Sequence, residues 1–172
     1  MKSNNTSKLV AAGGFTVLLT VLLLYFSYIL PSGKLFFFSL STVFISVMVI
    51  EYGQKVAFLT FTATALLGFI IIPDKIILVP YILFFGYYGI LKSFLEKKKK
   101  ILFEWVIKLF IYNIALFVFY LLYVGLFGLP VTGHLPLSLL VLILELYFLI
   151  YDYCYTMAVS YYMKVLRDII IK

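Results

Sequence analysis

Two carboxylates lie inside one long apolar run near the end of the chain, and their type and spacing could do chemistry. Glu145 and Asp152 are seven residues apart in LPLSLLVLILELYFLIYDYCY, so a helix would place them on one face, two turns apart. A charge at the centre of a membrane helix costs roughly 2.5–3.5 kcal/mol, and such residues often serve a ligand, an ion or a proton path. The alternative is a structural pair that is neutralised by protonation or by tyrosine and lysine partners.

Three further polar side chains lie in the preceding apolar run, residues 101–127. Glu104 and Lys108 have the i,i+4 spacing of an intrahelical salt bridge, which we expect near the membrane surface. Asn113 falls near mid-membrane, where its amide would bond a neighbouring helix or a ligand. Both interpretations of Asn113 stay open.

Sequence signatures of catalysis and of metal binding are missing. The chain has one histidine, His134, and one cysteine, Cys154, which excludes a cysteine metal cluster and a disulfide within the chain. It contains no HExxH, no GxSxG and no glycine-rich phosphate loop. We therefore expect a protein that is not an enzyme and that carries no cofactor or metal.

The composition identifies the environment of these residues. Of 172 residues, 65% are hydrophobic and 12% are charged, against roughly 45–50% and about 25% in a soluble domain. Too little polar surface remains to cover a soluble globule, so lipid must be the solvent. The apolar runs are continuous and do not alternate as barrel strands do, which favours helices.

The apolar runs predict an all-α integral membrane protein with a single transmembrane domain. Each run is long enough to span a bilayer, which takes about 20 residues, and proline or glycine marks most of the ends. The first run is too long for a signal peptide, whose apolar region has about 7–15 residues. The six predicted helices cover residues 8–30, 35–52, 55–72, 76–94, 101–127 and 136–164.

Cationic residues predict that both termini lie on the cytoplasmic side of a bacterial plasma membrane. Six helices put three lysine- and arginine-rich segments on one side, as the positive-inside rule requires. The opposite loops hold only Lys34, the pair Asp74 and Lys75, and His134. The net charge of +7 is thus assigned to topology, and nucleic acid is not expected as a partner. The cationic segments contain Lys2 and Lys8, then Lys92 and Lys97–Lys100, and finally Lys164, Arg167 and Lys172.

Small residues mark places where another helix can approach closely. The first helix opens with Ala11, Ala12, Gly13 and Gly14, and the third carries a four-residue repeat of small side chains. These faces predict either ordinary packing within the bundle or docking of another membrane subunit. The repeat in the third helix consists of Thr60, Thr64 and Gly68.

Three stretches carry a resemblance to a known family. They are AAGG in the first helix, IEYGQKVAFLTFTATALLGFIIIPDK across the second and third, and LILELYFLIYDYCY in the sixth. Together with six short helices in under 200 residues, they resemble the S components of energy-coupling factor (ECF) vitamin transporters. The resemblance implies a six-helix bundle that captures a vitamin or similar nutrient from outside. It also implies docking on a transmembrane coupling subunit that is driven by two cytoplasmic ATPase subunits.

The resemblance also suggests roles for individual residues. In that family, small-residue stretches on the first and third helices dock the coupling subunit, which here corresponds to Ala11 to Gly14 and, with alanine replaced, to Thr60, Thr64 and Gly68. The family binds its nutrient near the outer surface, between the later helices. The resulting candidate ligand-binding residues are Glu145, Asp152, Asn113, Tyr81, Tyr120, Tyr123 and Tyr147.

Two other functions fit the same pattern. One is a morphogenetic scaffold similar to MreD, which would hold a protein partner and need no ligand pocket. The other is a small ion-coupled carrier that uses Glu145 and Asp152, although carriers are usually larger or contain internal repeats.

The predicted topology can be tested by cysteine labelling, with Cys154 replaced by serine. A cysteine placed within Lys97–Lys100 should resist an impermeant reagent added to intact cells. A cysteine beside His134 should react with the same reagent. The reverse pattern would overturn the predicted orientation.

Overall fold

The computed structural model describes residues 2–30, 32–96, 101–126, 128 and 136–167. Helix is the only regular structure in this part of the chain. Six of its helices are long and apolar enough to cross a membrane, which confirms the predicted helical class and the number of spans. The predicted loop residues Lys97–Lys100 and His134 lie outside the described residues, as do Asp168 and Lys172.

The helix boundaries agree with the predicted ones to within a few residues, except at the start of the chain. The first helix begins at Lys2 rather than near Lys8. The fourth span is one continuous helical segment of several types, with a 3₁₀ start and a π turn in its middle. The helices are α1 (Lys2–Ile29), α2 (Lys34–Tyr52), α3 (Gln54–Ile71), η1 (Lys75–Ile77), α4 (Leu78–Pro80), the π turn Tyr81–Phe85, α5 (Gly86–Leu95), α6 (Ile101–Leu121) with the π turn Leu122–Leu126, and α7 (Leu137–Tyr161) with the π turn Tyr162–Leu166.

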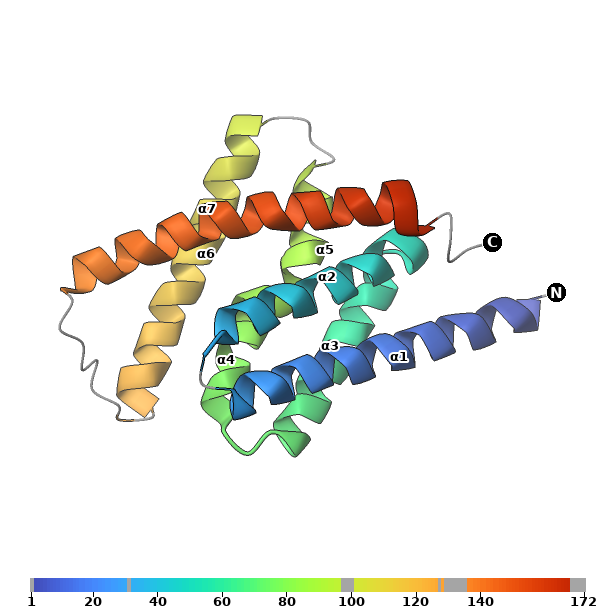
Figure 1. The fold of residues 1–172 in the computed structure, drawn as a ribbon, viewed down its shortest axis with the longest axis horizontal. Coiled ribbons are helices and arrows are strands. Elements are labelled where there is room, and N and C mark those ends of the chain that lie inside the picture. Colours follow the sequence, from blue (N-terminus) through green and yellow to red (C-terminus); the bar gives the residue numbers. More distant parts are fainter. Residues whose placement is uncertain (1, 31, 97–100, 127, 129–135, 168–172) are drawn as a thin grey trace. The chain divides into compact units, whose positions relative to one another are not determined.

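The chain divides into two compact units, Met1–Leu122 and Tyr123–Lys172. The first contains α1 to α6, and the second contains α7. In the first unit, α1, α2 and α3 pack against one another, and α2 also packs along α5 (Figure 1). These contacts make the amino-terminal helices the packing centre of the first unit.

The core between α1, α2 and α3 is built from apolar side chains of moderate size. Ile45, Met48 and Ala57 are buried together, and Ala12 of α1 packs against them. A single residue, Gly53, joins α2 to α3, with φ of 86° and ψ of 170°. Only glycine adopts that conformation readily, so Gly53 lets two helices meet with no loop between them.

Several serine and threonine hydroxyls in the first unit donate hydrogen bonds inside the protein. Thr20 donates to Thr16 O at 2.7 Å, and Ser46 donates to Thr42 O at 2.7 Å. Bonds of this kind return the hydroxyl hydrogen to the residue's own helix, which suits a bilayer where no water is available.

The Thr42 hydroxyl joins two helices. Its Oγ1 donates to Phe85 O at 2.8 Å and lies 3.2 Å from Phe38 O. Phe85 is the last residue of the π turn. Next to it, a methyl group added at Gly86 would lie 2.5 Å from ring carbons of Phe61. The absence of a side chain at Gly86 therefore lets α3 and α5 approach closely.

Two residues of the short connection after α3, Asp74 and Lys75, hydrogen-bond to the backbone of the helical segments on either side. Lys75 Nζ donates to Ile72 O at 2.7 Å and also to Phe69 O. Asp74 accepts a hydrogen bond from the Ile76 amide at 3.0 Å. Lys75 thus satisfies carbonyls at the end of α3, where the helix itself provides no donors.

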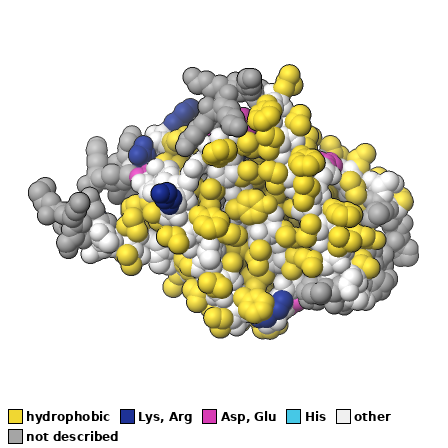
Figure 2. Space-filling model, turned by 180° about the vertical axis from the view of Figure 1, so that it is seen from behind, with side chains coloured by type: hydrophobic (Ala, Val, Ile, Leu, Met, Phe, Trp, Pro, Cys, Tyr) yellow, Lys and Arg dark blue, Asp and Glu magenta, His cyan; other side chains and the backbone are white. Residues whose placement is uncertain are grey.

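The surface is largely apolar. Leu59, Ile70 and Leu102 are 67%, 75% and 84% exposed, and hydrophobic side chains spread across the face shown in Figure 2. Soluble proteins rarely expose this much apolar surface. The surface therefore agrees with the membrane environment indicated by the composition.

Replacing Thr42 by valine should lower the free energy of unfolding by about 1–2 kcal/mol, because the hydrogen bond between α2 and Phe85 O is lost. The measurement is a denaturant titration in mixed micelles. The matched control is Thr62→Val, which removes only a bond to Phe58 O of the same helix. Equal losses in the two variants would show that the Thr42–Phe85 bond adds nothing.

Candidate functional site

An apolar groove of about 830 Å³ runs between α1 and α3. Its lining comes from nine residues of α1, between Leu9 and Tyr25, and six residues of α3, between Val56 and Ile71. Both helices belong to the first unit. The groove is therefore a property of that unit alone.

Two small residues of α1, Gly13 and Gly14, belong to the lining of the groove. A methyl group added at Gly13 would lie 3.9 Å from Met48 Cε and 4.0 Å from Thr60 Oγ1, so Gly13 sits in ordinary contact with both neighbouring helices. A methyl group at Gly14 would meet nothing within 4 Å. Gly14 therefore borders open space in the groove.

Of the seven residues predicted to form a docking face, three line the groove and four do not. Gly13, Gly14 and Thr60 line the groove. Ala11 is exposed but is not part of the lining, and Ala12 packs into the core.

The remaining two predicted docking residues point into the protein. Thr64 is fully buried and its hydroxyl donates to Thr60 O at 2.9 Å. Gly68 is packed so tightly that an added methyl group would lie 2.9 Å from Leu78 Cδ2. Their four-residue spacing serves packing between α3 and the fourth span, which is the bundle-packing interpretation of the same pattern.

Most of the groove lining is valine and leucine, which small-residue reasoning does not single out. A signal was nevertheless present, because the lining residues of α1 recur as adjacent pairs at four-residue steps. The pairs begin at Leu9, Gly13, Val17 and Val21, and the row ends at Tyr25. A row of this kind marks one face of a helix. It is hard to recognise in the sequence, because the residues on the other faces are apolar as well.

The predicted ligand-binding residues belong to both units. In the first unit, Tyr81 is 0% exposed and its ring packs 5.8 Å from that of Phe61. Asn113 and Tyr120 lie seven residues apart on α6, so they share a face, and both are exposed. The Asn113 amide donates to Leu109 O of its own helix at 3.0 Å.

In the second unit, α7 carries the two carboxylates and a row of aromatic rings. The ring of Tyr147 lies 6.2 Å from that of Tyr151, nearly parallel at 11°, and Tyr151 lies 6.2 Å from Tyr155. Glu145 and Asp152 are on the same helix, and Thr156 donates to Asp152 O at 2.7 Å. Tyr123 is the first residue of this unit. Tyr151, Tyr155 and Asp152 are buried, whereas Glu145 and Tyr147 are partly exposed. Glu145 and Tyr147 are therefore the candidates on α7 that a polar, planar ligand could reach.

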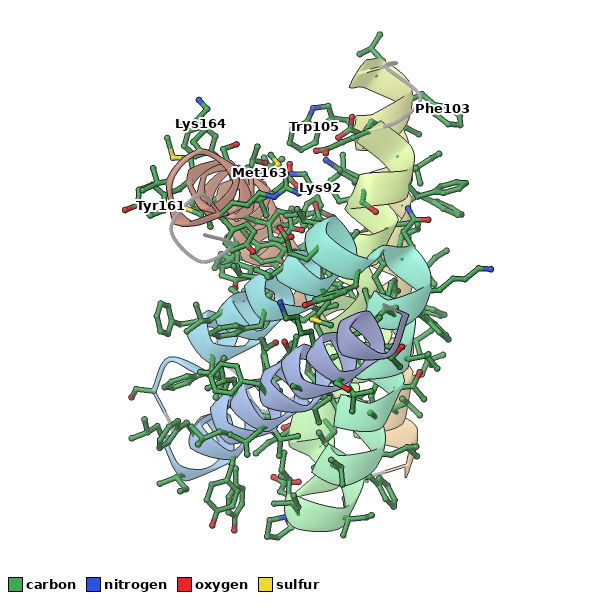
Figure 3. All side chains as sticks on the ribbon, turned by 90° about the vertical axis from the view of Figure 1, so that its right-hand side faces the viewer. Lys92, Phe103, Trp105, Tyr161, Met163 and Lys164 are labelled. Carbon is green, nitrogen blue, oxygen red and sulfur yellow. The ribbon has the colours of Figure 1, made fainter. Side chains whose placement is uncertain are left out.

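The predicted salt bridge of α6 is confirmed. Lys108 Nζ donates to Glu104 Oε1, and Lys108 lies over the Trp105 ring at 5.5 Å. Trp105 and Phe103 extend from opposite sides of α6 (Figure 3). On α5, Lys92 pairs with Glu96 at 3.8 Å. These pairs neutralise cationic side chains near helix ends.

No group of three or more histidine, cysteine, aspartate or glutamate residues that could hold a metal ion occurs among the described residues. Comparisons with protein-family models, with curated proteins and with solved structures find no match to this chain. The groove of the first unit and the carboxylate-bearing helix of the second are therefore the features on which function can be argued.

Proposed function

We propose that this chain is the substrate-capture subunit of an ECF-type importer, with both termini on the cytoplasmic side of a bacterial plasma membrane. The observation that carries the proposal is the apolar groove between α1 and α3. These are the two helices that the resemblance assigns to docking of a coupling subunit. Gly13, Gly14 and Thr60, three of the residues assigned to docking from the sequence, line it.

The groove suits an apolar helix of a partner. Its Thr60 hydroxyl donates to Val56 O at 2.9 Å, so the lining has little need of a polar partner. Within a bilayer, helix association depends on close packing rather than on expulsion of water. A groove with open space at Gly14 provides that packing to a helix from another subunit.

Capture of the nutrient would fall to the later helices. Glu145 and Tyr147, which are partly exposed, provide an acceptor and an aromatic ring on α7. Energy for import would come from the ATPase subunits of the complex, since no phosphate-binding loop occurs in this sequence. In this proposal the chain binds the nutrient, and its ATPase partners provide the free energy for import.

Filling the groove should block docking. Gly14→Trp places a large side chain in open space, so the variant should fold and bind nutrient while failing to assemble with the coupling subunit. The measurement is co-purification of the complex in mild detergent. A Trp at Ala12 or Gly13 is a poorer test, because Ala12 is packed into the core and Gly13 is in contact with Met48 and Thr60.

The matched control is Phe15→Trp, the next residue on α1, which is 65% exposed and outside the lining. It should assemble as the unaltered chain does. Normal assembly of a folded Gly14→Trp variant would remove the groove from the docking surface.

Replacing Glu145 by glutamine tests the capture site. If Glu145 accepts a charge-assisted hydrogen bond, affinity for the compound that co-purifies from native membranes should fall by about 1.5–3 kcal/mol. Calorimetric titration measures the change. Glu104→Gln, which alters the α6 salt bridge instead, serves as the control. Unchanged binding by Glu145→Gln would remove Glu145 from the site.

The whole proposal can be tested by affinity purification from native membranes, with mass spectrometry of both proteins and small molecules. A coupling subunit with ATPases, or a bound vitamin-like compound, is expected. Cell-wall or cytoskeletal proteins without a small molecule would instead support the scaffold function and make the carboxylates of α7 structural.

A further inference from the structure

The exposed face of α6 carries a polar residue among apolar ones. Of the six described spans, the one that contains α6 has the smallest buried share. One side of α6 faces the protein, where Tyr112 is buried and its ring lies 5.1 Å from that of Phe84. The opposite side consists of exposed residues, which form what we call the α6 seam. They are Phe103, Val106, Phe110, Asn113, Phe117 and Tyr120.

The spacing of the α6 seam suits packing against another helix. Its members follow one another at alternating steps of three and four residues, which is the spacing of the a and d positions in a coiled coil. Phe103, the first member, extends from α6 on the side opposite Trp105 (Figure 3). A second helix that lies along the α6 seam would therefore meet a continuous row of side chains over most of the bilayer core.

Asn113 lies at the middle of its membrane span. The span runs from Leu102 to Gly125, so eleven of its residues precede Asn113 (102–112) and twelve follow it (114–125). Copies of a membrane protein insert in one orientation, so every copy presents Asn113 at the same depth. A two-fold axis along the bilayer normal would place two α6 helices in parallel and bring the two Asn113 side chains together.

We propose that the α6 seam is the interface of a homodimer, in which two α6 helices pack in parallel and their Asn113 amides hydrogen-bond to each other. A side-chain amide both donates and accepts, so it is complementary to an identical amide. The Asn113 amide donates to Leu109 O at 3.0 Å within its own helix, and the dimer adds a bond between helices. Such bonds favour helix association in membranes.

Hydrogen-bond complementarity at this depth favours a second copy over other occupants. Lipid acyl chains offer no group that pairs with an amide. A different membrane protein would need a polar side chain of its own at the level of Asn113, whereas a second copy provides one by symmetry. A single asparagine in an apolar seam also fixes the register of the two helices. The Asn113 side chain therefore gives the interface its specificity.

This inference does not depend on the transporter proposal. The α6 seam contains no residue of α1 or α3, the two helices that line the groove. Self-association of the purified chain and assembly with a coupling subunit are separate measurements. The failure of one is therefore distinguishable from the failure of the other.

The affinity test is energy transfer between fluorescently labelled chains in phosphatidylcholine vesicles at several lipid-to-protein ratios. The label is attached at Lys34→Cys, an exposed position outside the α6 seam, with Cys154 replaced by serine. Energy transfer should fall as lipid dilutes the chain. Asn113→Leu should weaken dimerisation about tenfold. Asn113→Gln keeps the amide and should change it less than about threefold.

Disulfide cross-linking identifies the face that forms the interface. With Cys154 replaced by serine, Phe117→Cys should form a disulfide-linked dimer on oxidation. The matched control is Ile114→Cys, which is 46% exposed but lies outside the α6 seam, and it should stay monomeric.

Three results in vesicles would overturn the proposal: no energy transfer at any lipid ratio, dimerisation of Asn113→Leu as strong as that of the unaltered chain, or equal cross-linking of Ile114→Cys and Phe117→Cys. In native membranes, an adduct of Phe117→Cys with a different protein in place of the dimer would also overturn it.

Discussion

A bilayer core offers no water to an unpaired polar group, and this constraint explains how the first unit is assembled. Its buried threonine and serine hydroxyls donate to carbonyls of their own helices, as Thr20 and Ser46 do. The π turn at Tyr81–Phe85 is tied to α2 by Thr42, which donates to Phe85 O. Lys75 meets the carbonyls at the end of α3 in the same way. Polar residues are thus bonded within their own helix or, at Thr42, to a neighbouring one.

Side-chain size decides how closely the helices of the first unit approach one another. Gly86 admits the ring of Phe61, and Gly68 admits Leu78, so the contacts of α3 with the fourth span are filled. At Gly14 nothing fills the space, and the groove between α1 and α3 is the result. Glycine therefore allows tight contacts between α3 and the fourth span, at Gly68 and Gly86, whereas Gly14 borders the open groove between α3 and α1.

The apolar lining of the groove matches an apolar helix from another subunit. Helices in a bilayer gain little from merely leaving lipid. Docking of such a helix therefore depends on the close packing that the open space at Gly14 allows.

The sequence by itself determined the class of this protein, because 65% hydrophobic residues and continuous runs of spanning length leave few other structures in lipid. It also predicted the helix ends at Gly53 and Pro73, since glycine and proline act locally, and the pair Glu104–Lys108, since i,i+4 neighbours meet in any helix. The π turns were not predicted, and neither was the hydrogen bond from Thr42 to Phe85 O, because it joins residues that are far apart in the sequence.

Only the tertiary structure decided which small residues are open and which are packed. Gly14 and Gly68 look alike in a sequence of apolar residues, yet one faces open space and the other meets Leu78. Thr60 lines the groove while Thr64, one turn further, is buried. The physical reason is that helical periodicity defines the faces of a helix, whereas the partner of each face is determined by the packing of the other helices.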